Sequence, residues 1–529
     1  MSNTVENKKE NNTADAVIDE IFIHEVSKHV KVQNRFHKFI SSATKAAGIM
    51  LLAAIVSLIV ANSPLYPAFH EFWHMHIGFF VGGFTGEMSM VHAINDILMA
   101  IFFLLVGLEI KYEMTVGELT NIRQALLPII AAAGGVIVPI IIYVSFNLNS
   151  PETIHGWGVP MATDIAFALG IMALLGNKVP SGIRIFLSTL AVADDIIAIL
   201  VIAVFYGNTP SMMWLGFSAA IMVVLVILNK KHVYGLAPYL MLGVLLWYCV
   251  YMSGVHSTIA GVLLAFTIPS GSHINIRSFV SWSGKQAANA HEIYKPDVAI
   301  VSQKDYLGIV ENLSNISRQV IPPSTRLEHK IYPWVYFLIL PLFALTNADV
   351  ALAGTDITAV VATPEFLGVF FGLLLGKPIG IILFSYILVK SKLAPLPENV
   401  NWGHVVGAGI LGGVGFTMAI FVANLAFTDP AVIAIAKFAI LTASLVAGVT
   451  GFLVLNAQAS IAAKKGISYV TSVREDVVPT TFEAEFAEEG REVIEEIASP
   501  LVKEELAALH DEGALKTEVV LEVSKNIEK

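Results

Sequence analysis

Long apolar stretches, separated by short polar turns, dominate the chain from about residue 39 to residue 455. A helix that crosses a bilayer needs roughly 20 mostly apolar residues, and the chain divides into about twelve such segments. The runs 97–108 and 221–228 are apolar on every side, whereas a transmembrane β-barrel would show alternating segments of roughly ten residues. The pattern predicts an all-α polytopic membrane protein with about 12 transmembrane helices.

Polar segments mark the domain limits. The predicted parts are a cytoplasmic N-terminal segment (1–37), a transmembrane domain (38–460) with a cytoplasmic insert (271–325), and an acidic cytoplasmic tail (461–529). Ile18, Phe22 and Val26 have helical spacing, so residues 1–37 form either a helix on the anionic membrane surface or a solvated helix. The tail is either a weakly amphipathic helix or disordered. Solvated appendages and regulatory domains remain alternatives for insert and tail.

Composition supports the membrane assignment. The 529 residues are 55% hydrophobic and 14% charged, with a mean hydropathy of +0.70, which is too apolar for a soluble globular protein. The net charge of −10 comes largely from the two ends of the chain and suggests no nucleic-acid partner. A single cysteine, Cys249, excludes an intramolecular disulfide. We expect no cleavable signal, because residues 1–37 are polar and the first span can direct its own insertion.

The distribution of Lys and Arg predicts the orientation. Alternate turns carry basic residues, and the turns between them carry none, with Lys437 near the last span as the exception. Cytoplasmic loops retain Lys and Arg. We therefore predict a multi-pass protein of the bacterial inner (plasma) membrane with both termini in the cytoplasm.

Four ionisable residues lie within predicted spans: Asp164, Asp194, Asp195 and Lys377. A charged residue at the centre of a membrane helix costs roughly 2.5–3.5 kcal/mol, which argues that these residues are used. Asp194 and Asp195 are adjacent, about 100° apart on a helix. One can face a cavity while the other reaches a neighbouring helix. Lys377 can pair with either Asp194 or Asp164.

Two spans are interrupted by Gly and Pro. Asp164 lies in the first, 156–170, beside Pro160, and the second, 407–418, is rich in glycine. They occupy matching places in the third to fifth and the last three spans, which predicts inverted repeats whose broken helices meet at the bilayer midplane. Close glycine packing is the alternative for the second span. Asp164 beside helix N-termini and Lys377 beside C-termini would offset the exposed dipole ends.

Several strings resemble those of NhaA-type sodium/proton antiporters. They are Ala162-Thr-Asp-Ile-Ala-Phe-Ala-Leu-Gly170, Asp194-Asp195, Gly376-Lys-Pro378 and Gly415-Phe-Thr-Met418, together with 95–111, 253–258 and 326–334. The resemblance covers roughly residues 40–460 in order. It implies an NhaA-like antiporter fold, with inverted repeats and two crossed broken helices. Inverted repeats are an established property of such transporters, so this expectation follows from the resemblance as well as from the matching breaks.

The resemblance also implies the site. Asp194 and Asp195 form the core of the cation and proton site, Thr163 and Asp164 lie where the unwound helices cross, and Lys377 neutralises them. The transported Na⁺ would be held by oxygen atoms of Asp194, Asp195 and Thr163. No cofactor is implied, only the transported Na⁺ or Li⁺ and H⁺.

A pH-sensing set is implied in the same way. Its members are Glu109, Glu113, Glu328 and His329 at the cytoplasmic mouth, and His256. Two residues depart from the expected pattern: Tyr112 stands where the family carries a basic residue, and Tyr332 replaces a second histidine. These departures bear on the pH profile rather than on the transport chemistry. The segment 63–92 resembles the family's dimer-forming hairpin region, which predicts a homodimer.

The sequence therefore predicts a transporter rather than an enzyme. The expected activity is electrogenic, pH-regulated export of Na⁺ or Li⁺ in exchange for H⁺. Burial favours the neutral form of a carboxyl group and a nearby cation favours the ionised form, so H⁺ and Na⁺ compete for one site. A sodium-coupled symporter of an organic anion is the alternative. An intramembrane aspartyl protease is disfavoured because the chain lacks a Gly-x-Gly-Asp string.

Overall fold

The computed structural model describes residues 42–81, 84–120, 122–207, 209–271, 274–351, 356–397 and 399–465. The predicted N-terminal helix and nearly all of the acidic tail lie outside these residues. The chain divides into two compact units, and the larger comprises Ile40–Ser270 and Pro323–Ser472. Gly271–Pro322, most of the predicted insert, belongs to the smaller unit. The domain boundaries proposed from the sequence stay predictions.

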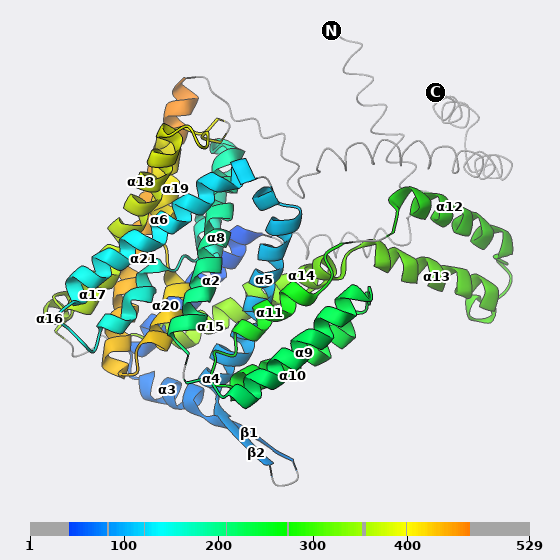
Figure 1. Cartoon of the computed structure of the whole chain (residues 1–529), viewed down its shortest axis with the longest axis horizontal. Coiled ribbons are helices and arrows are strands. Elements are labelled where there is room, and N and C mark those ends of the chain that lie inside the picture. Colours follow the sequence, from blue (N-terminus) through cyan, green and yellow to red (C-terminus); the bar gives the residue numbers. More distant parts are fainter. Residues whose placement is uncertain are drawn as a thin grey trace. The chain divides into compact units, whose positions relative to one another are not determined.

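The larger unit is a helical bundle (Figure 1). Up to the insert it contains α2 (Ala43–Ala61), α3 (Tyr66–His74), β1 (His76–Val81), β2 (Phe84–Ser89), α4 (Met90–Ala93), η1 (Ile94–Leu98), α5 (Met99–Thr115), η2 (Glu118–Thr120), α6 (Ile122–Asn147), η3 (Ile154–Met161), α7 (Ile165–Leu174), η4 (Gly176–Lys178), α8 (Ser181–Phe205), α9 (Met212–Lys230), α10 (Leu236–Met252) and α11 (Ile259–Thr267). After the insert come α14 (Pro323–Trp334), η6 (Val335–Ile339), α15 (Leu340–Asn347), α16 (Ile357–Val361), α17 (Pro364–Phe371), η7 (Gly372–Gly376), α18 (Lys377–Lys390), α19 (Trp402–Gly412), α20 (Phe416–Ala426) and α21 (Pro430–Lys464).

The helices confirm an all-α polytopic membrane protein. Within the described residues, eight helices are long and apolar enough to cross a membrane, and the bent pair α19–α20 makes a ninth. The other predicted spans correspond to α10, α11 and the consecutive α14, η6 and α15. These three are too short, or begin too polar, to be recognised by length and composition alone. The order of the twelve predicted segments is kept.

The smaller unit contains a helical hairpin in its described part. It consists of α12 (Ile276–Ile293), η5 (Ile300–Ser302) and α13 (Lys304–Val320), and α12 packs against α13. Asn275 caps α12 by accepting hydrogen bonds from the backbone N–H groups of Arg277 and Ser278, which is a favoured role for Asn. The insert thus forms regular helices rather than an extended loop.

A two-stranded ribbon is the only β-structure in the described part of the chain. Strands β1 and β2 pair antiparallel, with His76 opposite Ser89 and Val81 opposite Phe84. The ribbon lies between α3 and α4, inside the segment 63–92 that the sequence marked as a hairpin region. We call the end of the bundle next to the ribbon the hairpin end.

Two three-helix repeats make up one side of the bundle. The first is α6, η3–α7 and α8, and the second is α17–α18, α19–α20 and α21. Their leading helices, α6 and α18, pack closely against each other. Gly134 and Gly380 allow this approach, because a Cβ atom on Gly380 would lie 2.0 Å from the carbonyl oxygen of Gly134. The element η3 packs against α20, so the two interrupted spans meet.

Candidate functional site

The two interrupted helices are joined through their unwound segments. Between η3 and α7 the backbone is extended, with Ala162 at φ −75° and ψ 142°, while α19 and α20 are bent by 42° across their break. The backbone N–H of Asp164 donates to the carbonyl of Val414 over 2.8 Å. Each break therefore satisfies a backbone group that the other leaves unpaired, as burial in a membrane protein requires.

Asp164 caps two helices at this crossing. Its carboxylate accepts a hydrogen bond of 3.0 Å from the backbone N–H of Phe167 in α7. It also accepts from the backbone N–H and the hydroxyl of Thr417 in α20, over 3.1 Å and 2.5 Å. The residue is only 2% exposed. A negative charge at two helix N-termini is electrostatically favourable, and the structure places Asp164 there.

Lys377 lies at the opposite pole of the crossing and is completely buried. Its Nζ donates to Asp194 Oδ2 over 2.5 Å and to the carbonyl of Met161, the last residue of η3. A cation beside the C-terminal end of η3 offsets the negative end of that short helix. Of the two pairings that the sequence left open, the structure shows the one with Asp194.

Asp194 is held by a second neighbour as well. The hydroxyl of Thr163 donates to Asp194 Oδ2 over 2.6 Å and also lies 3.0 Å from the carbonyl oxygen of Gly412. In the part of the chain that the structure describes, Asp194 Oδ1 has no hydrogen-bond partner. One carboxylate oxygen is therefore fixed, and the other keeps its full capacity to accept a proton or a cation.

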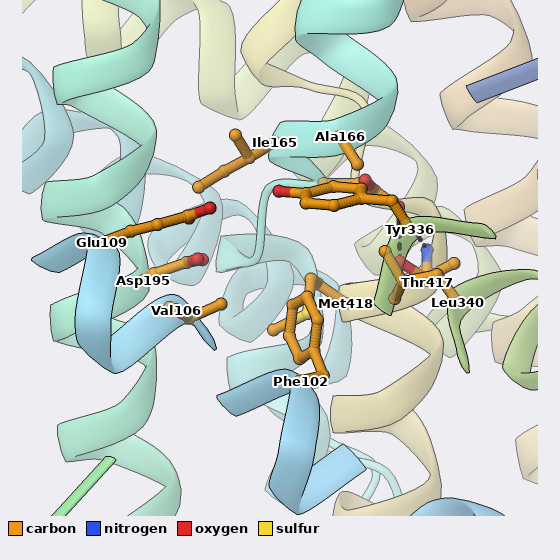
Figure 2. A pocket seen from close by; sticks show the side chains of 11 residues that line it. Phe102, Val106, Glu109, Ile165, Ala166, Asp195, Tyr336, Leu340, Thr417 and Met418 are labelled. Atoms are coloured by element: carbon orange, nitrogen blue, oxygen red, sulfur yellow. Dashed lines mark hydrogen bonds between the residues drawn. The ribbon is translucent and has the colours of Figure 1, made fainter. Parts of the chain in front are cut away.

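Asp195 faces a different direction and lines a small cavity (Figure 2). The cavity has a volume of about 10 Å³, close to the lower limit of roughly 10–15 Å³ for one water molecule. It is lined by Phe102, Val106, Glu109, Asp164, Ile165, Ala166, Asp195, Tyr336, Leu340, Thr417 and Met418. The adjacent carboxylates thus divide as the helical geometry predicted, one toward Lys377 and one toward a cavity.

Part of the predicted pH-sensing set gathers beside this cavity. Glu109 points into it from α5, next to Asp195 (Figure 2), and the charges of Glu113 and Glu328 act on Glu109. Glu113 of α5 and Glu328 of α14 therefore lie within electrostatic reach of Glu109, which lines the cavity. Tyr332 is close to the same group, because its ring lies 4.3 Å from that of Tyr336.

Two members of the set lie elsewhere. His329 is exposed on α14, and His256 lies at the hairpin end, with Nε2 2.5 Å from the carbonyl oxygen of Tyr206. The structure therefore does not bring His256 together with Glu109 and Glu328. The pH-sensing roles of all five residues stay predictions.

Sequence reasoning did not assign roles to several residues of the site. Tyr336 enters the cavity from the π-helical turn η6, and its hydroxyl points toward Glu109 (Figure 2). Thr417 was noted only as part of a string, although its hydroxyl binds Asp164. Met161 contributes a backbone carbonyl, for which a sequence carries no signal. The Pro333-Trp334 string beside Tyr336 was the available hint.

The family model described as Na⁺/H⁺ antiporter 1 matches residues 37–455. The chain belongs to this family. The match includes every element of the crossing, from η3 and α7 to α19 and α20, and also α8 with its two aspartates. It therefore places the buried charges in the part of the chain that family members share.

Curated relatives give the same family assignment. The chain is 44% identical to the Na(+)/H(+) antiporter NhaA of Wolinella succinogenes, over 81% of this chain and 94% of the relative. It is 45% identical to Na(+)/H(+) antiporter NhaA 2 of Flavobacterium johnsoniae, over 79% and 91%. It also matches the solved structure of the sodium proton antiporter MjNhaP1 of Methanocaldococcus jannaschii, with 11% identity, a TM-score of 0.40 and coverage of 82% and 98%. That last likeness adds nothing to the family assignment.

Proposed function

We propose that this member of the Na⁺/H⁺ antiporter 1 family exports Na⁺ across the membrane in exchange for H⁺. The observation that carries the proposal is the buried group at the helix crossing, where Asp194 is paired with Lys377 and Asp195 lines the cavity. Carboxylate and hydroxyl oxygens are suitable ligands for a hard cation such as Na⁺ or Li⁺. Asp195, the free oxygen of Asp194 and the Thr163 hydroxyl supply them.

Exchange follows from competition at Asp195. Burial favours its protonated form, and a cation beside it favours the ionised form, so H⁺ and Na⁺ exclude each other. When the site is open to the cytoplasm, the proton leaves and Na⁺ takes its place. When it is open to the outside, the inward proton gradient protonates the carboxylate and releases Na⁺. Rigid movement of one set of repeats around a fixed site is the usual way to alternate access.

Exchange is electrogenic in this scheme. Lys377 can be a second proton carrier, because Na⁺ at Asp194 competes with the ammonium group that now occupies Oδ2. Two protons would then move for each Na⁺. A membrane potential, negative inside, would therefore accelerate export, which a neutral one-for-one exchange would not show.

The cavity speaks against symport of an organic anion. In this conformation its volume of about 10 Å³ holds no carboxylate-bearing solute, and its lining includes three carboxylates, Glu109, Asp164 and Asp195. These negative charges favour a cation and oppose an anion. A monatomic cation and a proton fit the cavity in both size and charge.

The cellular setting is part of the proposal. The protein would lie in the bacterial inner membrane with both termini in the cytoplasm, as the Lys and Arg distribution indicates. The hairpin end then faces outward, and the Glu109 side of the cavity faces the cytoplasm. We also propose a homodimer formed through the β1–β2 ribbon, with membrane lipid around it.

The test is Na⁺-induced proton release from vesicles that hold an imposed pH gradient, at pH 6 to 9. Added Na⁺ should release protons from vesicles with the native protein. Asp195→Asn should lower the rate of proton release at least about 100-fold, because the amide cannot exchange a proton. Glu365→Gln is the matched control, since Glu365 is 7% exposed and is absent from the cavity lining. We expect it to keep near-native exchange. A folded native protein that responds to neither Na⁺ nor Li⁺ would refute the antiporter assignment.

A further inference from the structure

Polar contacts at the hairpin end connect the second repeat to the end of α15. Asn424 of α20 donates its Nδ2 to Asn347 Oδ1 of α15 over 2.8 Å. Lys437 of α21 binds the carboxylate of Asp349, which follows α15, over 2.9 Å. Both contacts join the second repeat to one short segment, 347–349. The second pair also explains why a basic residue lies at this end of the bundle.

Asn347 is the centre of a buried amide cluster. It is 2% exposed, and its Nδ2 donates to Asn95 Oδ1 over 2.9 Å and lies 2.9 Å from the hydroxyl oxygen of Thr346. Asn95 lies in the π-helical turn η1, and such turns occur often at functional sites. Buried amides must be hydrogen-bonded to be tolerated. We call Asn95, Asn347 and Asn424 the amide cluster.

An aromatic layer separates the amide cluster from the cavity. Phe103, Phe343 and Phe421 are all buried, and the Phe421 ring lies 5.5 Å from that of Phe103 and 6.3 Å from that of Phe343. Each of three helices has the same order from the cavity outward. Along α5 and η1 the order is Val106, Phe103 and Asn95. Along α15 it is Leu340, Phe343 and Asn347. Along α20 it is Met418, Phe421 and Asn424.

The helical spacing keeps these layers on one path. Side chains that are three or four residues apart lie on the same face of a helix. On α15 and α20, therefore, the cavity-lining residue, the phenylalanine and the asparagine follow one another on one face toward the hairpin end. Glu109 lies beyond Val106 on α5, away from the hairpin end, whereas the aromatic layer and the amide cluster lie on the hairpin side of the cavity. The amide cluster is thus a buried polar layer between the aromatic layer and the hairpin end.

We propose that the amide cluster and the Lys437–Asp349 pair form the gate that keeps the site closed toward the hairpin end. The proposal builds on alternating access in the proposed function. Opening to that side requires α20 and α21 to separate from segment 347–349, which breaks both contacts. Asn424, Asn347, Lys437 and Asp349 then position the repeats without touching the transported ion, and they set the balance between the two open forms.

The gate can be tested by cysteine labelling from the hairpin side. The reporter is Ala344→Cys, because Ala344 is fully buried on α15, between Leu340 and Asn347, and Cys249 is replaced by Ser. An impermeant maleimide is added outside right-side-out vesicles without Na⁺ or a pH gradient. Asn424→Ala should increase the labelling rate about fivefold, the effect of losing one net hydrogen bond.

The matched control is Asn147→Ala. Asn147 is also fully buried, and its Nδ2 bonds the carbonyl groups of Tyr143 and Pro364, but these contacts stay within the two repeats. We expect its labelling rate to equal that of the parent. An equal rise in both variants would mean general loosening, and no rise in folded Asn424→Ala would mean that the cluster is not a gate. Either result overturns the proposal.

Charge exchange supplies the rescue test. Asp349→Lys and Lys437→Asp should each speed labelling, and the double exchange should return it toward the parent rate, because the attraction is restored. The single variants should also raise the KM for Na⁺ supplied on the Glu109 side, because a smaller fraction of the protein has its site open to that side. The change in kcat should be smaller. Failure of the double exchange to restore labelling counts against the gate. Labelling requires no ion movement, so a failed antiport assay would leave this result interpretable.

Discussion

A lysine in the middle of a membrane protein needs an explanation at the level of single atoms. Lys377 has no exposed surface, yet it contacts one carboxylate and one backbone carbonyl, both aligned to accept its hydrogens. Such a pair need not stabilise the protein, because desolvation of the two charges offsets their attraction. Removing one partner is different, because it leaves the other charge buried alone.

We therefore predict that Lys377→Met lowers stability by about 3–5 kcal/mol, the usual cost of breaking a buried ion pair. The double variant Asp194→Asn/Lys377→Met should recover a large part of this loss, because no isolated charge remains. Thermal unfolding in detergent measures both. Equal melting temperatures for Lys377→Met and the native protein would show that the pair is not maintained in solution.

The sequence was informative about these residues because charge is rare in hydrocarbon. The free-energy cost of placing a charge in the bilayer was enough to select Asp164, Asp194, Asp195 and Lys377. The helical twist predicted that the two adjacent aspartates point in different directions, but not which of them pairs with Lys377, since three-dimensional distance decides it. Tyr336 and the Met161 carbonyl remained unassigned, because neither a tyrosine near an interface nor a backbone group is unusual in sequence.

At the scale of elements, the contact between α6 and α18 depends on missing side chains. A Cβ on Gly380 would lie 2.0 Å from the Gly134 carbonyl oxygen, and a Cβ on Gly134 would lie 2.4 Å from the Gly380 carbonyl oxygen. The helices can approach this closely only because both positions are glycine, as in other membrane helix pairs. Lys377 is the first residue of α18, so this contact also fixes the position of its side chain along the bundle.

Gly380→Ala should force the two helices apart and destabilise the protein by about 1–3 kcal/mol, the common cost of overpacking. Gly216→Ala in α9 is the control, because nothing lies within 4 Å of its Cβ position. It should be neutral or slightly stabilising, since alanine favours helix. The comparison requires only melting temperatures, and a larger loss for Gly216→Ala would contradict the packing argument.

The elements were predictable where hydrophobic length decides them. Long spans such as α8 and α21 stood out, whereas α11 has nine residues and could be placed only by its neighbours. The breaks at 162–164 and 413–415 were visible as the nearby Pro160 and as the glycines of the second span. The π-helical turns η1, η6 and η7 were not, because one extra residue per turn leaves no compositional mark.

At the scale of the whole molecule, the β1–β2 ribbon leaves the helical bundle as an isolated pair of strands. A lone two-stranded ribbon is marginally stable in water, and the edges of such a pair offer unpaired backbone groups to another chain. This geometry supports the proposed homodimer, with ribbons from two subunits pairing edge to edge.

Replacing residues 76–89 by a short Gly-Ser linker should therefore yield monomers, observed as a halved mass by light scattering with detergent contribution subtracted. Exchange per protein in vesicles should stay within about twofold of native, because the ribbon contributes nothing to the cavity lining. A dimer that survives the deletion would place the subunit interface elsewhere.

The small cavity beside Asp195 has a pharmacological consequence. A space of about 10 Å³ admits a bare ion or a water molecule, but no guanidine or other drug-sized cation. Compounds that compete directly at Asp195 have nowhere to bind in this conformation. Inhibitor discovery against this protein should therefore look for sites outside this cavity, and compounds found there should slow turnover without resembling Na⁺.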